Sequence, residues 1–170
     1  MLFKNLCGER LSALGLGCMR FPTFEGDDGR VDEAKAAEIV RFAMEHGVNY
    51  YDTAWAYHKS QSEPLMGRIL SAYPRGSFYL ASKFPGYSAE NLEKKEEIFS
   101  AQLERCRVDH FDFYLCHNVS DGNIDSYLDP KYGLLDFLRA QKAEGRIRHL
   151  GFSTHGSLET VRRFLDAFPE

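Results

Sequence analysis

The sequence has few of the features that mark several large classes of protein. Its 170 residues contain no apolar run of about 18 residues, the length that a membrane-spanning helix needs. Its net charge of -4 provides no basic surface for nucleic acid or for an anionic membrane. The opening residues, MLFKN, do not begin the apolar segment of a signal peptide. We therefore predict a globular, cytoplasmic domain that binds neither nucleic acid nor a membrane.

Cysteine is scarce and widely spaced. No CxxC pair occurs among the four cysteines, which are Cys7, Cys18, Cys106 and Cys116. Such spacing does not provide the ligand pairs of a structural zinc site or the framework of a disulfide-rich domain. We therefore expect thiols that are mostly buried in a reducing compartment, and no metal site.

Two common nucleotide-binding motifs are also missing. The run Gly15-Leu16-Gly17-Cys18-Met19-Arg20 contains two glycines but lacks the third glycine of a dinucleotide-binding GxGxxG turn. No Walker A sequence is present. If this chain binds a nucleotide, it does so without either motif.

The sequence does contain a regular alternation of strand-like and helical segments. Five β-like runs occur, at residues 13–17, 48–51, 78–81, 111–115 and 147–152. A spacing of about 30 to 35 residues between strands is typical of βαβ units and a parallel sheet. We favour an α/β fold of the (β/α)8 TIM barrel type, of which the chain contains about five units. The open edge of such a sheet predicts self-association, or a partner or further strands that cover it.

Capping residues predict where the helices begin. Asp32 precedes an apolar stripe that Gly47 ends, and Ser62 and Ser157 precede two further helical patterns. Residues 92–106 read as one long charged helix, and residues from 134 to Gly145 as another. In the last helix we expect a buried face formed by Leu158, Val161, Leu165 and Phe168.

Polar residues follow the predicted strands at their carboxyl ends, where parallel α/β folds bind their ligands. Asp52, Lys83 and His117 end the second, third and fourth strands, and Tyr57 lies in the loop after Asp52. Each alone has a structural interpretation, such as a loop cap, a solvated lysine or a packed aromatic ring. Four such residues on one edge of the sheet favour a catalytic site.

The chemistry of these four side chains is mutually consistent. A tyrosine phenol has a reference pKa of about 10, and a neighbouring ammonium makes it a better proton donor. A carboxylate holds such an ammonium charged and oriented, and an imidazole can hydrogen-bond a substrate oxygen. Together these groups could polarise a carbonyl and protonate its oxygen. The hydride needed for reduction must then come from a nicotinamide cofactor.

Several sequence blocks resemble, in order, those of the aldo-keto reductase family. They are "LSALGLGCMRFP", "NYYDTAWAYHKSQSEPLMG", "YLASKF", "DFYLCHNV" and "IRHLGFSTHG". The resemblance implies a catalytic tetrad of Asp52, Tyr57, Lys83 and His117, with Tyr57 as proton donor to an aldehyde or ketone. Residues 3–6 and 10–13 resemble the hairpin that closes the barrel floor.

The same resemblance implies NADPH as cofactor, with NADH as the alternative. Ser153 corresponds to the serine that holds the nicotinamide carboxamide, and Thr154 stands where the family usually has asparagine. Met19 and Arg20 follow the first strand, where the family contacts cofactor or substrate, and Trp55 lies in the segment that lines the substrate pocket.

The largest departure from the family pattern concerns the end of the barrel. Family members bind the cofactor phosphates with residues after strands seven and eight, which this sequence does not contain. Residues 1–170 therefore read as the N-terminal portion of one barrel. The fourth and fifth blocks are most similar to a branch with a C-terminal ferredoxin-like iron–sulfur module, whose 4Fe-4S cysteine motif is not found here.

Two other functions compete with the reductase. A non-catalytic, reductase-like module could bind a nucleotide or a partner protein, because half a barrel would bind cofactor weakly. A metal-dependent barrel enzyme could use Asp52 and His117, but the sequence offers only His155 as a further ligand.

Overall fold

A five-stranded parallel sheet forms the centre of the molecule. The computed structural model describes residues 1–169, and its sheet has the order β3-β4-β5-β6-β7, so that every strand lies beside its neighbour in sequence. The strands are β3 (Leu16–Gly17), β4 (Tyr50–Asp52), β5 (Tyr79–Phe84), β6 (Phe111–Val119) and β7 (Ile147–Thr154). All four pairings are parallel. The predicted α/β fold, with about five units of a barrel, is confirmed.

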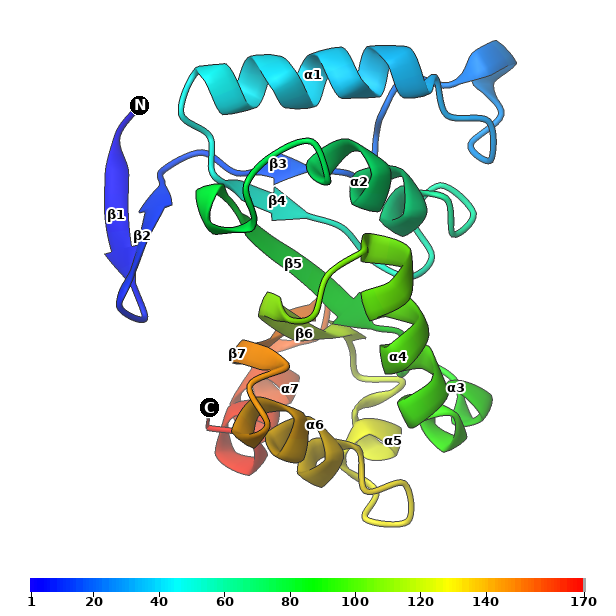
Figure 1. The fold of residues 1–170 in the computed structure, drawn as a ribbon. Helices are drawn as coiled ribbons and strands as arrows, with labels where there is room; N and C mark the ends of the chain where they lie inside the picture. The colour runs from blue at the N-terminus through cyan, green and yellow to red at the C-terminus, as the bar shows by residue number, and fades with distance from the viewer. Residues whose placement is uncertain (170) are drawn as a thin grey trace.

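Helices connect the strands along the outside of the sheet (Figure 1). They are α1 (Glu33–Glu45), α2 (Ser62–Leu70), α3 (Ala89–Glu93), α4 (Lys95–Cys106), α5 (Ile124–Leu128), α6 (Leu134–Ala143) and α7 (Leu158–Ala167). Two short 3-10 turns, η1 (Phe24–Gly26) and η2 (Arg75–Ser77), lie in the connections. No helix within residues 1–169 has the length and apolar character needed to cross a membrane.

The predicted N-terminal hairpin is confirmed. Strands β1 (Phe3–Leu6) and β2 (Glu9–Ser12) pair antiparallel and lie at the amino ends of the parallel strands (Figure 1). The hairpin is fixed to the residue before β4, because the Ser12 backbone N–H donates to Asn49 Oδ1 at 2.8 Å. It therefore covers the end of the sheet opposite to the carboxyl ends.

Side chains on the two faces of the sheet enter different cores. The larger core lies between sheet and helices and includes the buried residues Tyr51, Leu80, Phe99 and Tyr114. On the inner face a smaller cluster joins Leu11 of the hairpin to Ala81 and Phe113. The alternation along β5, where Leu80 faces the helices and Ala81 faces inward, follows from the two-residue period of a strand.

The capping predictions are right for two helices and wrong for one. The Asp32 carboxylate accepts from the Lys35 backbone N–H at 3.1 Å and starts α1, and Ser157 caps α7 in the same way. Ser62, however, is the first residue of α2 and does not cap it. Its hydroxyl is fully buried and donates to the Cys18 carbonyl at 2.9 Å, so it is unavailable to the helix.

One prediction about helix extent was also wrong, and one about helix packing was right only for Phe168. The segment predicted as one helix, 92–106, contains a break at Lys94 between α3 and α4. In α7 and its C-cap residue the inward positions are Thr160, Phe164 and Phe168, whereas Leu158 and Leu165 are exposed. These inward positions are four residues apart, so they lie on one face of the helix, and the two leucines lie off that face.

Candidate active site

The carboxyl ends of β4 and β5 bring a carboxylate and an ammonium into contact. Lys83 Nζ lies 2.5 Å from Asp52 Oδ1 and donates to the Thr53 carbonyl at 2.8 Å. The Lys83 residue is only 4% exposed. A buried ammonium is costly unless it is paired and hydrogen-bonded, and here both conditions are met.

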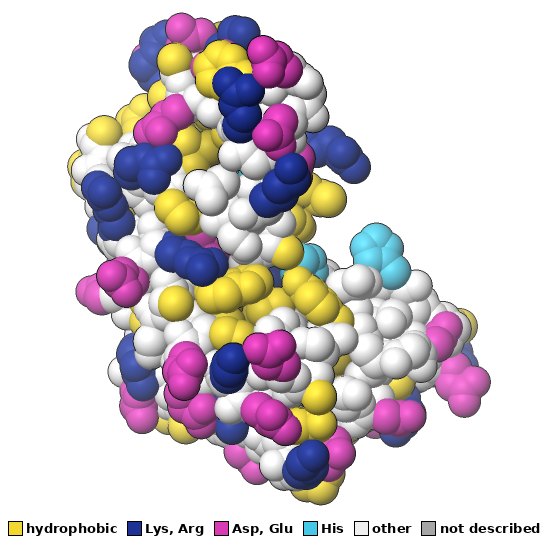
Figure 2. Space-filling view, turned by 90° about the vertical axis from the view of Figure 1, so that its right-hand side faces the viewer, with side chains coloured by type: hydrophobic (Ala, Val, Ile, Leu, Met, Phe, Trp, Pro, Cys, Tyr) yellow, Lys and Arg dark blue, Asp and Glu magenta, His cyan; other side chains and the backbone are white. Residues whose placement is uncertain are grey.

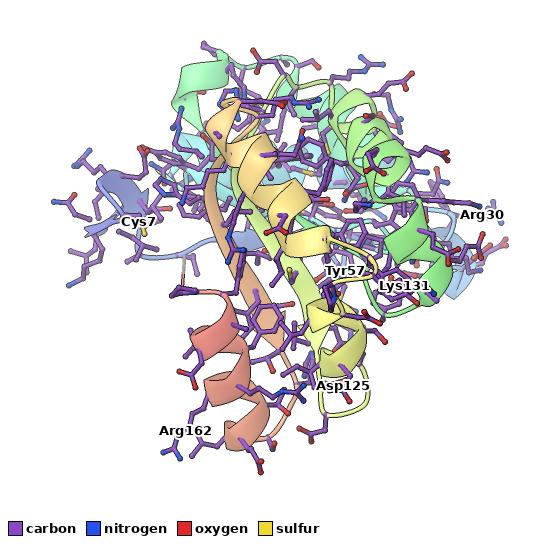
Figure 3. All side chains as sticks on the ribbon, turned by 90° about the horizontal axis from the view of Figure 1, so that it is seen from below. Cys7, Arg30, Tyr57, Asp125, Lys131 and Arg162 are labelled. Carbon is purple, nitrogen blue, oxygen red and sulfur yellow. The ribbon has the colours of Figure 1, made fainter. Side chains whose placement is uncertain are left out.

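The same ammonium reaches the phenol of Tyr57. Lys83 Nζ donates to Tyr57 Oη at 3.1 Å and lies 4.6 Å from the centre of the tyrosine ring. Tyr57 follows β4 in a loop on the side of the molecule away from Cys7 in the hairpin turn (Figure 3). Its ring packs edge-to-face on His117, with 5.7 Å between the ring centres. Lys83 and His117 lie far along the sequence from Asp52 and Tyr57, and the fold brings all four together.

His117 is held as a neutral imidazole. Burial, and then the charges of Lys83 and His155, lower the pKa of His117 to about 4. Its Nδ1 atom is buried and has no hydrogen-bond partner among the described residues. A neutral imidazole at this position can donate one hydrogen bond and accept another.

A buried polar network lies behind Lys83. Glu63 Oε1 accepts from Ser82 Oγ at 2.6 Å and from Gln102 Nε2 at 2.5 Å, and all three residues are fully buried. Gln102 Nε2 also donates to the Lys83 backbone carbonyl at 3.1 Å, while its Oε1 accepts from the Tyr114 hydroxyl. Burial raises the pKa of the Glu63 carboxyl. The network fixes the backbone from which Lys83 extends.

A cavity of about 660 Å³ opens beside Tyr57 and His117. Figure 2 shows histidine side chains at the border of a hollow in the surface. The lining residues are Met19, Arg20, Gly26, Asp28, Ala56, Tyr57, His58, Tyr87, His117, Asn118 and His155. The proposed contact residues Met19 and Arg20 are therefore part of the same pocket as Tyr57 and His117.

Ser153 and Thr154 shape the loops at this edge of the sheet but do not line the pocket. Ser153 Oγ accepts from the Asn118 backbone N–H at 2.8 Å. Thr154 Oγ1 donates to the Val119 carbonyl at 2.7 Å and accepts from the Gly156 N–H at 2.9 Å. The Thr154 hydroxyl thus both donates to and accepts from backbone groups, whereas the Ser153 hydroxyl accepts from one.

Trp55 lies outside the pocket in which the sequence placed it. Its indole packs against the main core, and the Arg105 guanidinium lies 3.7 Å above its ring. This cation–π contact and the surrounding apolar side chains account for its position. The substrate-pocket role proposed for Trp55 has no support from this arrangement.

Sequence reasoning missed several pocket residues that it could have found. Tyr87 follows β5 and Asn118 is the last residue but one of β6, so the rule that identified Lys83 and His117 applies to them equally. His155, which follows β7 and also lines the pocket, was considered in the sequence only as a metal ligand. Asp28 and His58 carry no such signal, because they come from loops whose docking depends on tertiary contacts. Within residues 1–169, no group of three or more His, Cys, Asp or Glu side chains is arranged so that it could hold a metal ion.

Comparisons with known proteins identify relatives of this chain. The chain is 31% identical to an L-galactose dehydrogenase of Arabidopsis thaliana over 95% of its own length and 50% of that protein. It thus spans about half of that relative. A putative aldo-keto reductase from Pseudomonas aeruginosa has a similar structure, with a TM-score of 0.77 and 28% identity over 97% of this chain and 64% of that one.

A third comparison concerns a structure that contains a nucleotide. The aldo/keto reductase of Klebsiella pneumoniae, solved with NADP and acetate, has a TM-score of 0.68 and 22% identity over 90% of this chain and 49% of that one. The sequence profile of the aldo/keto reductase family matches residues 13–168, nearly the whole chain. The chain therefore belongs to the aldo/keto reductase family.

Proposed function

We propose that this chain carries the catalytic groups of an NADPH-dependent reductase of aldehydes or ketones, with Tyr57 as proton donor. The observation that supports this most strongly is the buried ammonium of Lys83, which contacts both Asp52 and the Tyr57 hydroxyl. A phenol next to an ammonium donates its proton more readily, because the ammonium stabilises the phenolate that remains.

Each of the four residues has a separate task in this proposal. Tyr57 donates its proton to the carbonyl oxygen of the substrate, and Lys83 stabilises the phenolate left behind. Asp52 pairs with the Lys83 ammonium at 2.5 Å and holds it in place. His117, neutral at physiological pH, hydrogen-bonds the carbonyl oxygen and orients it toward Tyr57.

The pocket is suited to a nicotinamide cofactor and a polar substrate. Bound NADPH would supply the hydride. Arg20, Asn118 and His155 offer polar side chains along the pocket, and the buried, unpartnered Nδ1 of His117 leaves one hydrogen-bonding position open. NADPH is favoured over NADH because a structural relative was solved with NADP. We therefore propose a hydroxylated carbonyl compound, such as a sugar, as substrate. Its hydroxyl groups could hydrogen-bond these polar side chains, and the Arabidopsis relative is named for a sugar.

Several broader expectations remain predictions. We propose that residues 1–170 form the N-terminal portion of a single barrel whose remaining strands would complete the cofactor-phosphate site. A cytoplasmic location, an iron–sulfur module beyond the barrel and self-association through the open edge of the sheet at β7 belong to the same proposal. Sedimentation of the purified chain would detect the self-association.

Replacing Tyr57 by Phe tests the proposed chemistry. NADPH binding is measured by calorimetry and turnover by loss of nicotinamide absorbance with a panel of aldehydes, ketones and aldoses. Tyr57→Phe should lower kcat by at least about 100-fold, the usual contribution of a general acid, without changing NADPH affinity. Tyr87→Phe is the matched control, because it changes the other tyrosine of the same pocket.

Three results would count against the reductase. Equal turnover by Tyr57→Phe and the unchanged protein would remove Tyr57 as proton donor. Binding of NADPH with no turnover on any carbonyl would favour the non-catalytic module. If the folded chain does not bind NADPH, the proposal that this chain contains a cofactor site would be contradicted.

A further inference from the structure

The loop that carries Tyr57 has an unusual backbone. The three residues that follow it, His58, Lys59 and Ser60, all have positive φ, at 53°, 50° and 68°. None is glycine, so each pays a steric cost to adopt the left-handed conformation. Such a conformation persists where surrounding contacts hold it, and it is common at functional sites. Contacts with other parts of the chain must therefore stabilise the backbone of residues 58–60.

The imidazole of His58 provides the central contact. The residue is 2% exposed, although it lies in a loop. Its Nε2 accepts from the Phe21 backbone N–H at 3.0 Å, and its Nδ1 lies 2.8 Å from Asp28 Oδ1 and 3.2 Å from the Asp28 carbonyl. A backbone N–H can only donate, so Nε2 carries no proton. The proton therefore lies on Nδ1 and is donated to Asp28.

A second tether joins the same two loops. Lys59 Nζ lies 2.8 Å from Asp27 Oδ1, and that oxygen also accepts from the Gly29 backbone N–H at 2.9 Å. The segment that contains Asp27 and Asp28 is closed at its base by a bridge between Thr23 and Val31. Residues 23–31, which we call the flap, are thus docked on the loop of residues 57–61.

The flap and the Tyr57 loop form neighbouring parts of one pocket wall. Gly26 and Asp28 from the flap line the same cavity as Tyr57 and His58. The ring of Phe21, just before the flap, stacks on His58 with 6.1 Å between ring centres. Loss of the His58 contacts would therefore loosen the wall and the backbone next to the phenol together, leaving the Lys59–Asp27 ion pair as the remaining tether.

We infer that His58 is a positioning residue, which docks the flap on the Tyr57 loop and so sets both the place of the phenol and the shape of the substrate pocket. The inference rests on the proposed function for its catalytic consequence. Its structural content, the docking of two loops through one histidine, is measurable without any turnover.

Substitution of His58 by Leu and by Gln separates hydrogen bonding from packing. Leu fills a similar volume but neither accepts nor donates, whereas a Gln side chain can still accept from the Phe21 N–H. In His58→Leu we expect the Phe21 amide to exchange at least 10-fold faster and the nuclear Overhauser contact between the Tyr57 and His117 rings to be lost. His58→Gln should retain both. His46→Ala, which changes an exposed histidine at the end of α1, is the control.

Kinetics add a readout that simple loss of stability would not give. If the protein reduces carbonyls, His58→Leu should lower kcat about 10-fold or more and change the preference between small and bulky aldehydes, with Gln restoring most of both. If His58→Leu does not fold, Asp28→Ala tests the same tether, because the Asp28 side chain is 58% exposed and its removal leaves the core intact. Faster Phe21 exchange in that variant would support the inference.

The outcomes for this inference and for the proposed function are distinct. An unchanged Tyr57–His117 contact and unchanged Phe21 exchange in folded His58→Leu would overturn the positioning role, whatever the activity. Normal loop docking in a protein without turnover would count against the reductase alone, and would leave the structural role of His58 in place.

Discussion

The ammonium of Lys83 lies 2.5 Å from the Asp52 carboxylate and 3.1 Å from the Tyr57 hydroxyl, so one buried cation joins a charge partner to a proton donor. This relationship depends on the parallel register of the sheet. Asp52 is paired with Ala81 on β5, two residues before Lys83, so both side chains leave the inner face near the carboxyl ends of their strands.

Replacing Lys83 by Met removes the cation and keeps an unbranched side chain. We expect kcat for carbonyl reduction to fall about 100-fold or more, because the phenolate left on Tyr57 would lose its stabilising charge. Asp52→Asn keeps an oxygen acceptor for Lys83 but removes the negative charge, so its loss of kcat should be smaller. The two variants are compared by steady-state kinetics under saturating NADPH, and a larger loss in Asp52→Asn would contradict this ranking.

The state of His117 predicts how stability depends on pH. Its pKa is about 4 in the folded protein, below the usual 6.5, so the unfolded chain binds more protons between these values. The contribution of His117 to stability is therefore complete above about pH 6.5 and is lost as the pH falls toward 4. Urea midpoints measured at pH 5 and 7 should show this decline.

His117→Gln is the matched control for the pH experiment. It cannot titrate, so the difference between pH 5 and 7 should shrink relative to the unchanged protein. Glu63 acts in the opposite direction, because burial raises its pKa and its contribution to stability is lost as the pH rises through its folded value. An equal pH dependence in both proteins would show that His117 does not titrate as inferred.

Asp112, at the amino end of β6, is predicted to be important for stability rather than for chemistry. Its side chain is 2% exposed and its Oδ2 accepts from Arg75 at 2.6 Å and from the Leu80 backbone N–H at 2.8 Å. Asp112→Ala leaves the buried Leu80 N–H without an acceptor and removes the charge partner of Arg75, which still donates to the His110 carbonyl. The substitution should cost about 1 to 3 kcal/mol of unfolding free energy. Glu45→Ala breaks an exposed helix pair with Arg41 and should cost less than about 0.5 kcal/mol. Urea denaturation measures both, and similar costs would contradict the prediction.

The sequence predicted most reliably what depends on local pattern and on the parallel topology. The strand-end rule located Asp52, Lys83 and His117, because any side chain at the carboxyl end of a parallel strand faces the same edge. It could not identify His58, whose importance comes from contacts with residues 21 and 28. Contacts between loops that are far apart in the sequence leave no local pattern by which they could be predicted.

The failed prediction for Ser62 and the observed position of Trp55 have a common physical cause. Serine is a common helix cap, and Trp55 lies close to Tyr57 in the sequence. Tertiary contacts nevertheless decide where the side chains of Ser62 and Trp55 point. The Ser62 hydroxyl satisfies the buried Cys18 carbonyl, and the Trp55 indole packs under Arg105. In each case a local preference of modest size gave way to the need to satisfy a buried polar group or to fill the core.

Gly67 shows the same dominance of packing over local preference and provides a stability test. It lies inside α2, where Ala would normally be favoured over Gly by about 0.8 to 1 kcal/mol. A Cβ at this position would lie 2.2 Å from the Arg105 backbone carbonyl oxygen on α4, however, and backbone cannot move aside without separating the helices. We expect Gly67→Ala to destabilise the fold by about 1 to 3 kcal/mol, since overpacking outweighs the gain in propensity.

Gly76→Ala is the control, because nothing lies within 4 Å of its added Cβ. The control should be neutral or slightly stabilising in thermal denaturation, and a stabilised Gly67→Ala would mean that α2 and α4 are less closely packed than described.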